Sequence, residues 1–275
     1  MFIPMAVAIA EARIGKRGER YYSGRVPQLL ERGFIVFRSS TWMIVLSGFV
    51  EPVLYLLSFG YGIGMLLPTI ESGGESIKYA IFIAPALLAT SAMNGAIYDS
   101  TMNVFFKLTH DRIYHGMLAT SMGPLDVALG EIGWALLRGF SYASAFMVVV
   151  IPLGLIPSIW GILAIPAAVL IAFGFASCGM AITSYMKSFQ QLEIVNMLLL
   201  PMFLFSGSFF PLSVFPEWLQ FIANLLPLTH AINLVRGLCL GNINMALAGH
   251  AMYFVIMIIC GLFFTTKRLN ALFMK

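Results

Sequence analysis

The chain has few charged residues. Asp, Glu, Lys and Arg make up 10% of its 275 residues, whereas hydrophobic residues make up 60%. About a quarter of the residues of a soluble globular domain are charged. This scarcity of charge excludes an ordinary soluble protein and leaves no room for a separate soluble domain.

The motifs of common enzymes are also lacking. The sequence contains no G-x-x-x-x-G-K-[ST] phosphate loop, no H-E-x-x-H zinc pair and no G-x-S-x-G nucleophile elbow. Nor does it offer a carboxylate cluster for a metal, or a nucleophile beside a base. We therefore expect no catalytic residues, no metal site and no cofactor bound by this chain.

Cysteine is scarce as well. The three cysteines, Cys178, Cys239 and Cys260, have no metal-ligand spacing. We interpret them as small apolar packing residues, without a disulfide framework.

Long apolar runs dominate what is present. Each approaches the roughly 20 apolar residues that a helix needs to cross a bilayer, and helices are required because lipid cannot satisfy backbone polar groups. The sequence therefore predicts an all-α integral membrane protein with six transmembrane helices. The expected spans are 42–67, 78–103, 124–152, 158–185, 190–208 and 246–266.

The positive charges indicate the orientation. A net charge of +4 is compatible with nucleic-acid binding, but seven basic residues precede the first span, where the cytoplasmic leaflet explains them better. We expect a membrane protein with both termini cytoplasmic, in contact with the bilayer and not with nucleic acid. These seven residues are Arg13, Lys16, Arg17, Arg20, Arg25, Arg32 and Arg38.

Residues 1–41 form the predicted cytoplasmic arm, and 42–275 the membrane domain. In the arm, apolar residues recur at helical spacing, which favours an amphipathic helix along the membrane interface. A soluble cap packed on the bundle is the alternative. The apolar residues are Val26, Leu29, Leu30, Phe34 and Phe37.

Residues 209–245 break the simple hydropathy pattern. Pro211, Pro216 and Pro227 preclude one straight helix. We expect two short helices that dip into the outer leaflet and return, as an extracellular re-entrant hairpin before the last span.

Two sets of polar residues stand out in this apolar background. Glu51, Glu131 and Arg138 lie within predicted spans, where ionisable groups are costly. They either line a polar translocation path or form interhelix contacts, with Arg138 pairing with Glu131 or Glu51. His230, Asn233 and Arg236 recur on one helix side and are candidates for an outer gate; snorkelling toward the interface is the plainer alternative.

The most polar internal connection is the loop 104–123, which reads KLTHDRIYHGMLATSMGP from Lys107 onward. Its length suits a short surface helix that offers polar side chains to a cytosolic partner. The alternative is a solvated loop whose histidines have no role.

Three segments resemble known permeases. DRIYHGMLATSMGPLDVALGE at 111–131, the outer segment at 203–238 with its Pro-Leu-Thr-His and Val-Arg-Gly, and GFVEPVLYLLSFGYGIG at 48–64 are similar to ABC type-2 exporter permeases. The nodulation lipo-oligosaccharide exporter branch is the most similar in appearance, and polysaccharide and daunorubicin exporter permeases are similar too. The resemblance covers nearly the whole chain.

This resemblance implies a transport subunit without its own ATPase. Two cytosolic ABC ATP-binding subunits would carry ATP and magnesium, and a second permease copy would complete a homodimer. The exported substrate would be a lipid-linked oligosaccharide, a glycolipid or a hydrophobic drug. The 104–123 loop would couple to the ATPase through His110, Asp111, Arg112, Tyr114, His115 and Gly116.

One departure limits that implication. The family often has Gly-Thr-Leu-Glu where this chain has Gly116-Met117-Leu118, so the role of that acidic residue does not carry over. Two other classes remain open: a membrane-embedded transferase acting on a lipid carrier, and an ion-coupled carrier.

Overall fold

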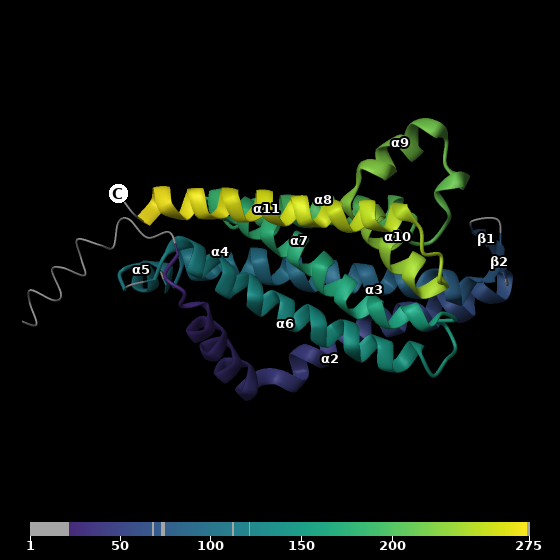
Figure 1. Ribbon diagram of the computed structural model, residues 1–275, viewed down its shortest axis with the longest axis horizontal. Helices are drawn as coiled ribbons and strands as arrows, with labels where there is room; N and C mark the ends of the chain where they lie inside the picture. Colours follow the sequence, from purple (N-terminus) through teal and green to yellow (C-terminus); the bar gives the residue numbers. More distant parts are fainter. Residues whose placement is uncertain (1–21, 68, 73–74, 112, 121, 274–275) are drawn as a thin grey trace, which may run out of the picture.

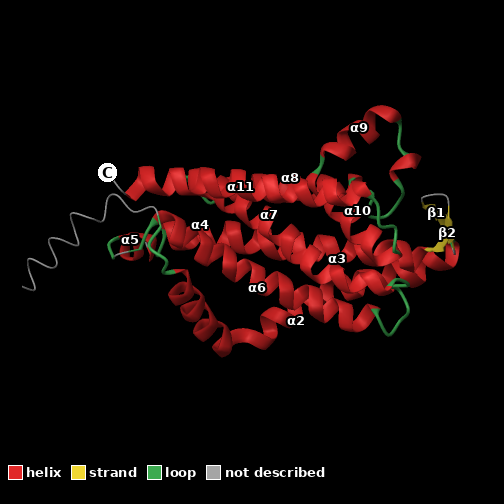
Figure 2. Ribbon diagram, viewed as in Figure 1, coloured by secondary structure: helices red, strands yellow, loops and turns green. Residues whose placement is uncertain are grey.

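The protein is a bundle of long helices. A computed structural model describes residues 22–67, 69–72, 75–111, 113–120 and 122–273, with the backbone alone over 36–49. Most of the helices run close to the long axis of the molecule (Figure 1), and helix is by far the most abundant element (Figure 2).

Four helical segments in the described residues are long and apolar enough to cross a bilayer: Tyr79–Thr109, Pro124–Val150, Ile159–Tyr185 and Met245–Leu272. The first joins α3 (Tyr79–Tyr98), the π-helical turn η2 (Asp99–Asn103) and α4 (Val104–Thr109). The second is α6 (Pro124–Val150), the third joins the 3-10 turn η3 (Ile159–Leu163) to α7 (Ala164–Tyr185), and the fourth lies in α11 (Met245–Phe273). The chain is therefore a multi-pass membrane protein, as its composition predicts.

Two further apolar helices are shorter. They are Val50–Leu66, which is the second part of α2 (Val26–Leu66), and α8 (Gln190–Phe205). The first part of α2 is set at an angle to the rest (Figure 1). The helix runs through residue 41, where the sequence had suggested a boundary between arm and membrane domain.

A small sheet, which the sequence did not predict, follows α2. Strands β1 (Thr69–Ser72) and β2 (Glu75–Lys78) pair antiparallel, with Thr69 opposite Lys78. Every long element of the described residues is helical, so the predicted all-α fold class is confirmed, with this short strand pair as an addition at one connection.

Helix α3 lies at the centre of the bundle. It packs against α2, α6, α7 and α10, and all its side chains from Phe82 to Ile97 except Asn94 are buried. Many of them are small, which lets neighbouring helices approach closely. The alanines are Ala84, Ala86, Ala89, Ala92 and Ala96.

Small residues also bring α7 and α11 together. A Cβ added at Gly261 would lie 2.6 Å from the backbone carbon of Ser177, and one added at Gly174 would lie 2.7 Å from Phe254. These glycines permit an approach that any larger residue would prevent. Close packing at these glycines thus holds α11 against α7.

The first turns of α2 are docked on α6. Leu29 fills the space above Gly130, where an added Cβ would come within 2.6 Å of it, and Leu30 lies similarly over Gly133. Asp126, fully buried, accepts hydrogen bonds from the backbone N–H groups of Ser23 at 2.6 Å, Arg25 at 3.0 Å and Gly123 at 2.9 Å. Leu29 and Leu30 therefore pack against α6, and the position of this arm relative to the membrane interface stays a prediction.

The predicted loop 104–123 is wrong over its first six residues. Residues Val104–Thr109 form α4, which prolongs α3 through η2, and a further short helix, α5 (Ile113–Leu118), follows. The non-helical connection is therefore shorter than the sequence suggested.

Residues 209–245 contain the expected pair of short helices. After the 3-10 turn η4 (Leu212–Val214), α9 (Glu217–Leu225) and α10 (Pro227–Leu240) meet at an angle of 85°. The hydroxyl of Thr229 donates a 2.5 Å hydrogen bond to the carbonyl of Ala223 across the bend. Helix α9 stands out from the bundle (Figure 1).

Candidate functional site

A cavity of about 600 Å³ lies between α2, α3, α6 and α8. Its wall is partly apolar, as expected at this depth, but it carries several polar side chains. The polar lining residues are Glu51, Thr90, Ser91, Asn94, Tyr98, Arg138, Tyr142 and Asn196. Such a combination, mostly apolar with a few placed polar groups, is typical of a ligand pocket.

Two of the three intramembrane residues singled out in the sequence line this cavity. Glu51 projects from α2 and is exposed to it, and Arg138 reaches it from α6 with its guanidinium largely buried. Glu131 is not among the lining residues. The structure therefore brings Glu51 and Arg138 to one site and places Glu131 elsewhere on α6.

Arg138 has a different partner from those expected. Its Nη1 lies 2.9 Å from Oδ1 of Asp99, and the two side chains are 9% and 3% exposed. The amide of Asn103 donates to the same carboxylate oxygen at 2.6 Å. The prediction that Arg138 pairs with Glu131 or Glu51 is therefore wrong, because the carboxylate that reaches it comes from η2.

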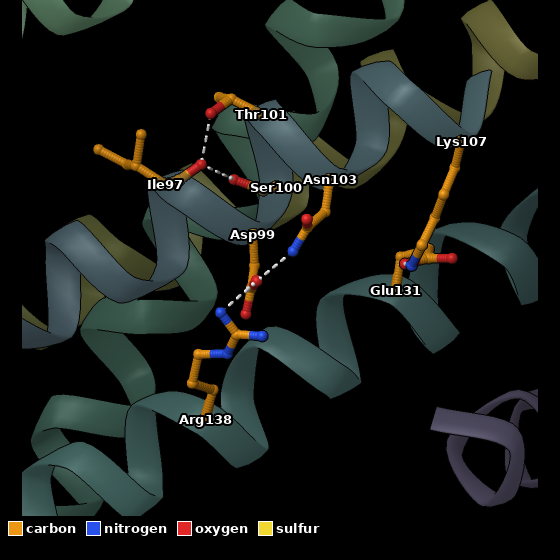
Figure 3. Close-up of polar contacts among 8 residues, drawn as sticks. All are labelled: Ile97, Asp99, Ser100, Thr101, Asn103, Lys107, Glu131 and Arg138. Atoms are coloured by element: carbon orange, nitrogen blue, oxygen red, sulfur yellow. Dashed lines mark hydrogen bonds and ion pairs between the residues drawn. The ribbon is translucent and has the colours of Figure 1, made fainter. Parts of the chain in front are cut away.

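Glu131 pairs with a residue of the same neighbouring segment. Its Oε2 lies 2.5 Å from Nζ of Lys107 on α4. Figure 3 shows both ion pairs spanning the gap between α6 and the η2–α4 segment. Each is an interhelix polar contact, which was one of the two roles expected for Glu131 and Arg138.

Asp99 is the first residue of a π-helical turn, η2. Such a turn inserts an extra residue into a helix and re-aims the side chains that follow, often at functional sites. The hydroxyls of Ser100 and Thr101 donate to the carbonyl of Ile97 at 3.3 Å and 2.6 Å (Figure 3). Gly179 of α7 faces these two side chains, where a Cβ would collide with Ser100.

The residues expected to couple to an ATPase lie around α5. Tyr114 is fully buried; burial, and then the nearby Glu131 carboxylate, raise the pKa of its phenol well above 10. His110, Asp111, His115 and Gly116 are exposed. Arg112 lies outside the described residues. Tyr114 lies beside Glu131, which is ion-paired to Lys107 of α4. The four exposed residues on and just before α5 therefore form a surface next to this ion pair.

The three outer candidates lie on α10. Nδ1 of His230 is 2.8 Å from Nδ1 of His250 on α11, and Arg236 donates to the carbonyl of Gly207 at 3.0 Å. The guanidinium of Arg236 also lies 3.8 Å from the centre of the Phe82 ring on α3. Asn233 is half-buried. These contacts attach α10 to α3, to α11 and to the turn that follows α8; the role of the three residues as an outer gate stays a prediction.

Helix α8 has a cavity on each side. The second, of about 670 Å³, is more apolar and lies between α8, α7 and α11. Leu199 lines both cavities, and Leu192 is the one fully buried residue of α8. Helix α8 therefore contacts the bundle less closely than α3 or α7 does.

Sequence reasoning missed Asp99, Asn94 and Asn196. Each is a polar residue inside a predicted span, so the signal that selected Glu51 was present for them too. Asn94 and Asn196 are exposed to the cavity from α3 and α8. Lys107 was named as a loop residue, and its ion pair was not foreseen.

The sequence was compared with known proteins. Residues 25–240 match the family model described as ABC-2 type transporter. The chain belongs to the ABC-2 type transporter family. The match includes the whole cavity lining, α5 and α10, so every candidate residue of the described site falls within the region that defines this ABC-2 chain.

Several relatives of this ABC-2 chain carry the name Nodulation protein J. The protein of Rhizobium leguminosarum bv. trifolii is 29% identical over 240 residues, covering 87% of this chain and 90% of the relative. That of Sinorhizobium fredii is 30% identical over 208 residues, covering 74% and 77%. That of Neorhizobium galegae is 29% identical over 246 residues, covering 87% and 92%. The resemblance recognised in the sequence is confirmed at the level of the family.

Proposed function

We propose that this chain is the permease subunit of an ATP-driven exporter in a prokaryotic plasma membrane. It would move an amphipathic substrate outward: a lipid-linked oligosaccharide, a glycolipid or a hydrophobic drug. The resemblance of residues 48–64 and 203–238 to the nodulation lipo-oligosaccharide exporter branch favours a lipo-oligosaccharide among these, and the similarity to proteins named Nodulation protein J agrees with that branch. The chain would bind no cofactor, and ATP and magnesium would belong to its partner.

The observation that carries this proposal is the cavity between α2, α3, α6 and α8. A volume of about 600 Å³ with both apolar and hydrogen-bonding walls suits a molecule with a polar headgroup and an apolar body. Ionisable side chains are costly in a membrane, and those that face a cavity within a bundle are candidates for a substrate pathway.

The proposed topology has six spans. The four long segments and the two shorter helices, Val50–Leu66 and α8, supply them, and α9–α10 would return to the outer side as a re-entrant hairpin. The exposed apolar side chains of α9, including Trp218 and Phe221, suit the outer interface. The end of α11 and α4–α5 share one end of the molecule, opposite the β1–β2 hairpin (Figure 1), which supports a cytoplasmic C-terminus at the α5 end.

The mechanism follows from the connection between α5 and the cavity. Two ATP-binding subunits would press on the exposed residues of α5 in two permease copies. Movement of α5 would be carried by α4 and η2, which are ion-paired to α6 through Lys107–Glu131 and Asp99–Arg138. Because Arg138 lines the cavity, a displacement of α4 would change the cavity wall.

Affinity purification tests the partnership. The tagged chain, extracted from its native cells with a mild detergent, should co-purify with an ABC ATP-binding subunit. The complex should hydrolyse ATP, and the chain freed from its partner should not. ATP hydrolysis by the isolated chain would contradict the proposal, as would a native complex that lacks any ATP-binding protein.

A further inference from the structure

The cavity carries one ionisable side chain that nothing in the described structure neutralises. We infer that Glu51 makes this cavity select amphiphiles with a cationic headgroup, tolerate neutral ones and disfavour anionic ones. The inference rests on the proposed function, because it names the substrate class of the same cavity. It makes Glu51 a specificity-determining residue.

The net charge of the cavity wall favours a cationic headgroup. Two of the lining residues have acidic or basic side chains, the carboxyl group of Glu51 and the guanidinium group of Arg138. The charge of Arg138 is balanced by Asp99, whose carboxylate oxygen is 2.9 Å away and which is itself buried. The pair contributes little net charge, so the wall as a whole is negative by the charge of Glu51.

Glu51 differs from the three acidic residues that are packed between helices of the bundle. Asp99 and Glu131 are ion-paired, and buried Asp126 accepts three backbone hydrogen bonds. Glu51 makes no ion pair or hydrogen bond with the residues that the structure describes, and its side chain is exposed to the cavity. A carboxylate without a partner at membrane depth is costly, and a bound counter-charge would offset that cost.

The rest of the wall suits a cation with an apolar body. Asn94 and Asn196 are neutral amides that can accept hydrogen bonds from an ammonium or a hydroxyl group. Tyr55 and Phe203, whose ring centres are 6.3 Å apart, provide aromatic faces that attract cations. Leu87, Leu199 and Leu200 supply the apolar surface for an acyl or ring system.

Binding of headgroup-matched probes tests this inference. The full-length chain is placed in nanodiscs of zwitterionic lipid and titrated with dansyl-labelled dodecyl probes that carry a trimethylammonium, a maltoside or a phosphate headgroup. Empty nanodiscs correct for partition into lipid. We expect the trimethylammonium probe to bind about tenfold more tightly than the phosphate probe, with the maltoside between them.

Two substitutions at this exposed position decide the role of Glu51. Glu51→Gln should weaken the trimethylammonium probe about tenfold and change maltoside binding little. Glu51→Lys should reverse the order, so that the phosphate probe binds best. Glu193→Gln is the matched control, because it removes one acidic charge from α8 at an exposed residue that does not line the cavity. It should leave all three affinities unchanged.

Three results would overturn the inference: equal binding of the three probes after the lipid correction, tighter binding of the phosphate probe to the unsubstituted chain, or an equal effect of Glu193→Gln and Glu51→Gln. These outcomes differ from a failure of the proposed function. The binding measurement needs no ATPase, whereas the proposed function fails if the native complex contains no ATP-binding protein.

Discussion

Breaking the Asp99–Arg138 ion pair from one side should destabilise the protein far more than removing both partners. Asp99→Ala leaves the guanidinium of Arg138 buried, 9% exposed, without its carboxylate. Arg138→Met leaves the Asp99 carboxylate, 3% exposed, without its cation. Removing one partner of a buried pair typically costs about 3–5 kcal/mol, because an uncompensated charge stays in a low-dielectric environment.

The double variant Asp99→Ala/Arg138→Met removes both charges at once. Replacing a whole buried pair by apolar side chains is often close to neutral, so the double variant should be about as stable as the unsubstituted protein. The interaction energy from the cycle should therefore be about 6–10 kcal/mol in magnitude, which is the sum of the two single-variant costs. Each single variant should melt roughly 10 °C lower than the parent.

Thermal unfolding in nanodiscs, followed by tryptophan fluorescence, measures the four proteins under identical conditions. The Lys107–Glu131 pair is the control, since the side chain of Lys107 is 30% exposed and water compensates part of a lost partner. Glu131→Gln, which leaves the partly exposed Lys107 without its carboxylate, should cost about 1 kcal/mol or less. If the two single effects at Asp99 and Arg138 simply add in the double variant, the ion pair does not exist as described.

Three further outcomes follow from the structure. If α9–α10 is a re-entrant hairpin, an impermeant thiol reagent should label both Ser213→Cys and Asn242→Cys in intact cells, in a background without the native cysteines. Labelling of only one of the two would mean that the segment crosses the membrane. Gly130→Ala should destabilise the protein by about 1–3 kcal/mol in a melting experiment, because the added Cβ would lie 2.6 Å from Leu29 of α2. Gly116→Ala is the control: there is open space around Gly116, so this substitution should be neutral or slightly stabilising. Arg112→Glu should lower export and substrate-stimulated ATP hydrolysis together while insertion persists; normal export would refute the coupling role of this segment.

The sequence predicts the long elements well, because hydropathy over about 20 residues reflects one strong requirement of the bilayer. It fails at α4. Lys107 and Thr109 make Val104–Thr109 look like a loop, yet the helix continues because Val104 and Phe105 are buried and Lys107 finds Glu131. Polar residues at a helix end are ambiguous until their partners are known.

The sequence also does not predict which residues form the ion pairs, and here the reason is different. Which acid meets Arg138 depends on the rotation of α6 against α3 and on the extra residue of η2, which turns Asp99 inward. Neither is encoded in the spacing of Glu131 and Arg138 along one helix. The cavity is also a product of tertiary structure, since Glu51, Asn94 and Asn196 come from three helices.

The central claim is that this chain and an ABC ATP-binding subunit together move an amphiphile outward. Its most direct test is accumulation of a fluorescent lipo-oligosaccharide in inside-out vesicles that contain the co-purified complex. We expect accumulation with ATP and magnesium, and none with a non-hydrolysable ATP analogue or with the permease chain alone. Accumulation that proceeds without the ATP-binding subunit would contradict the account.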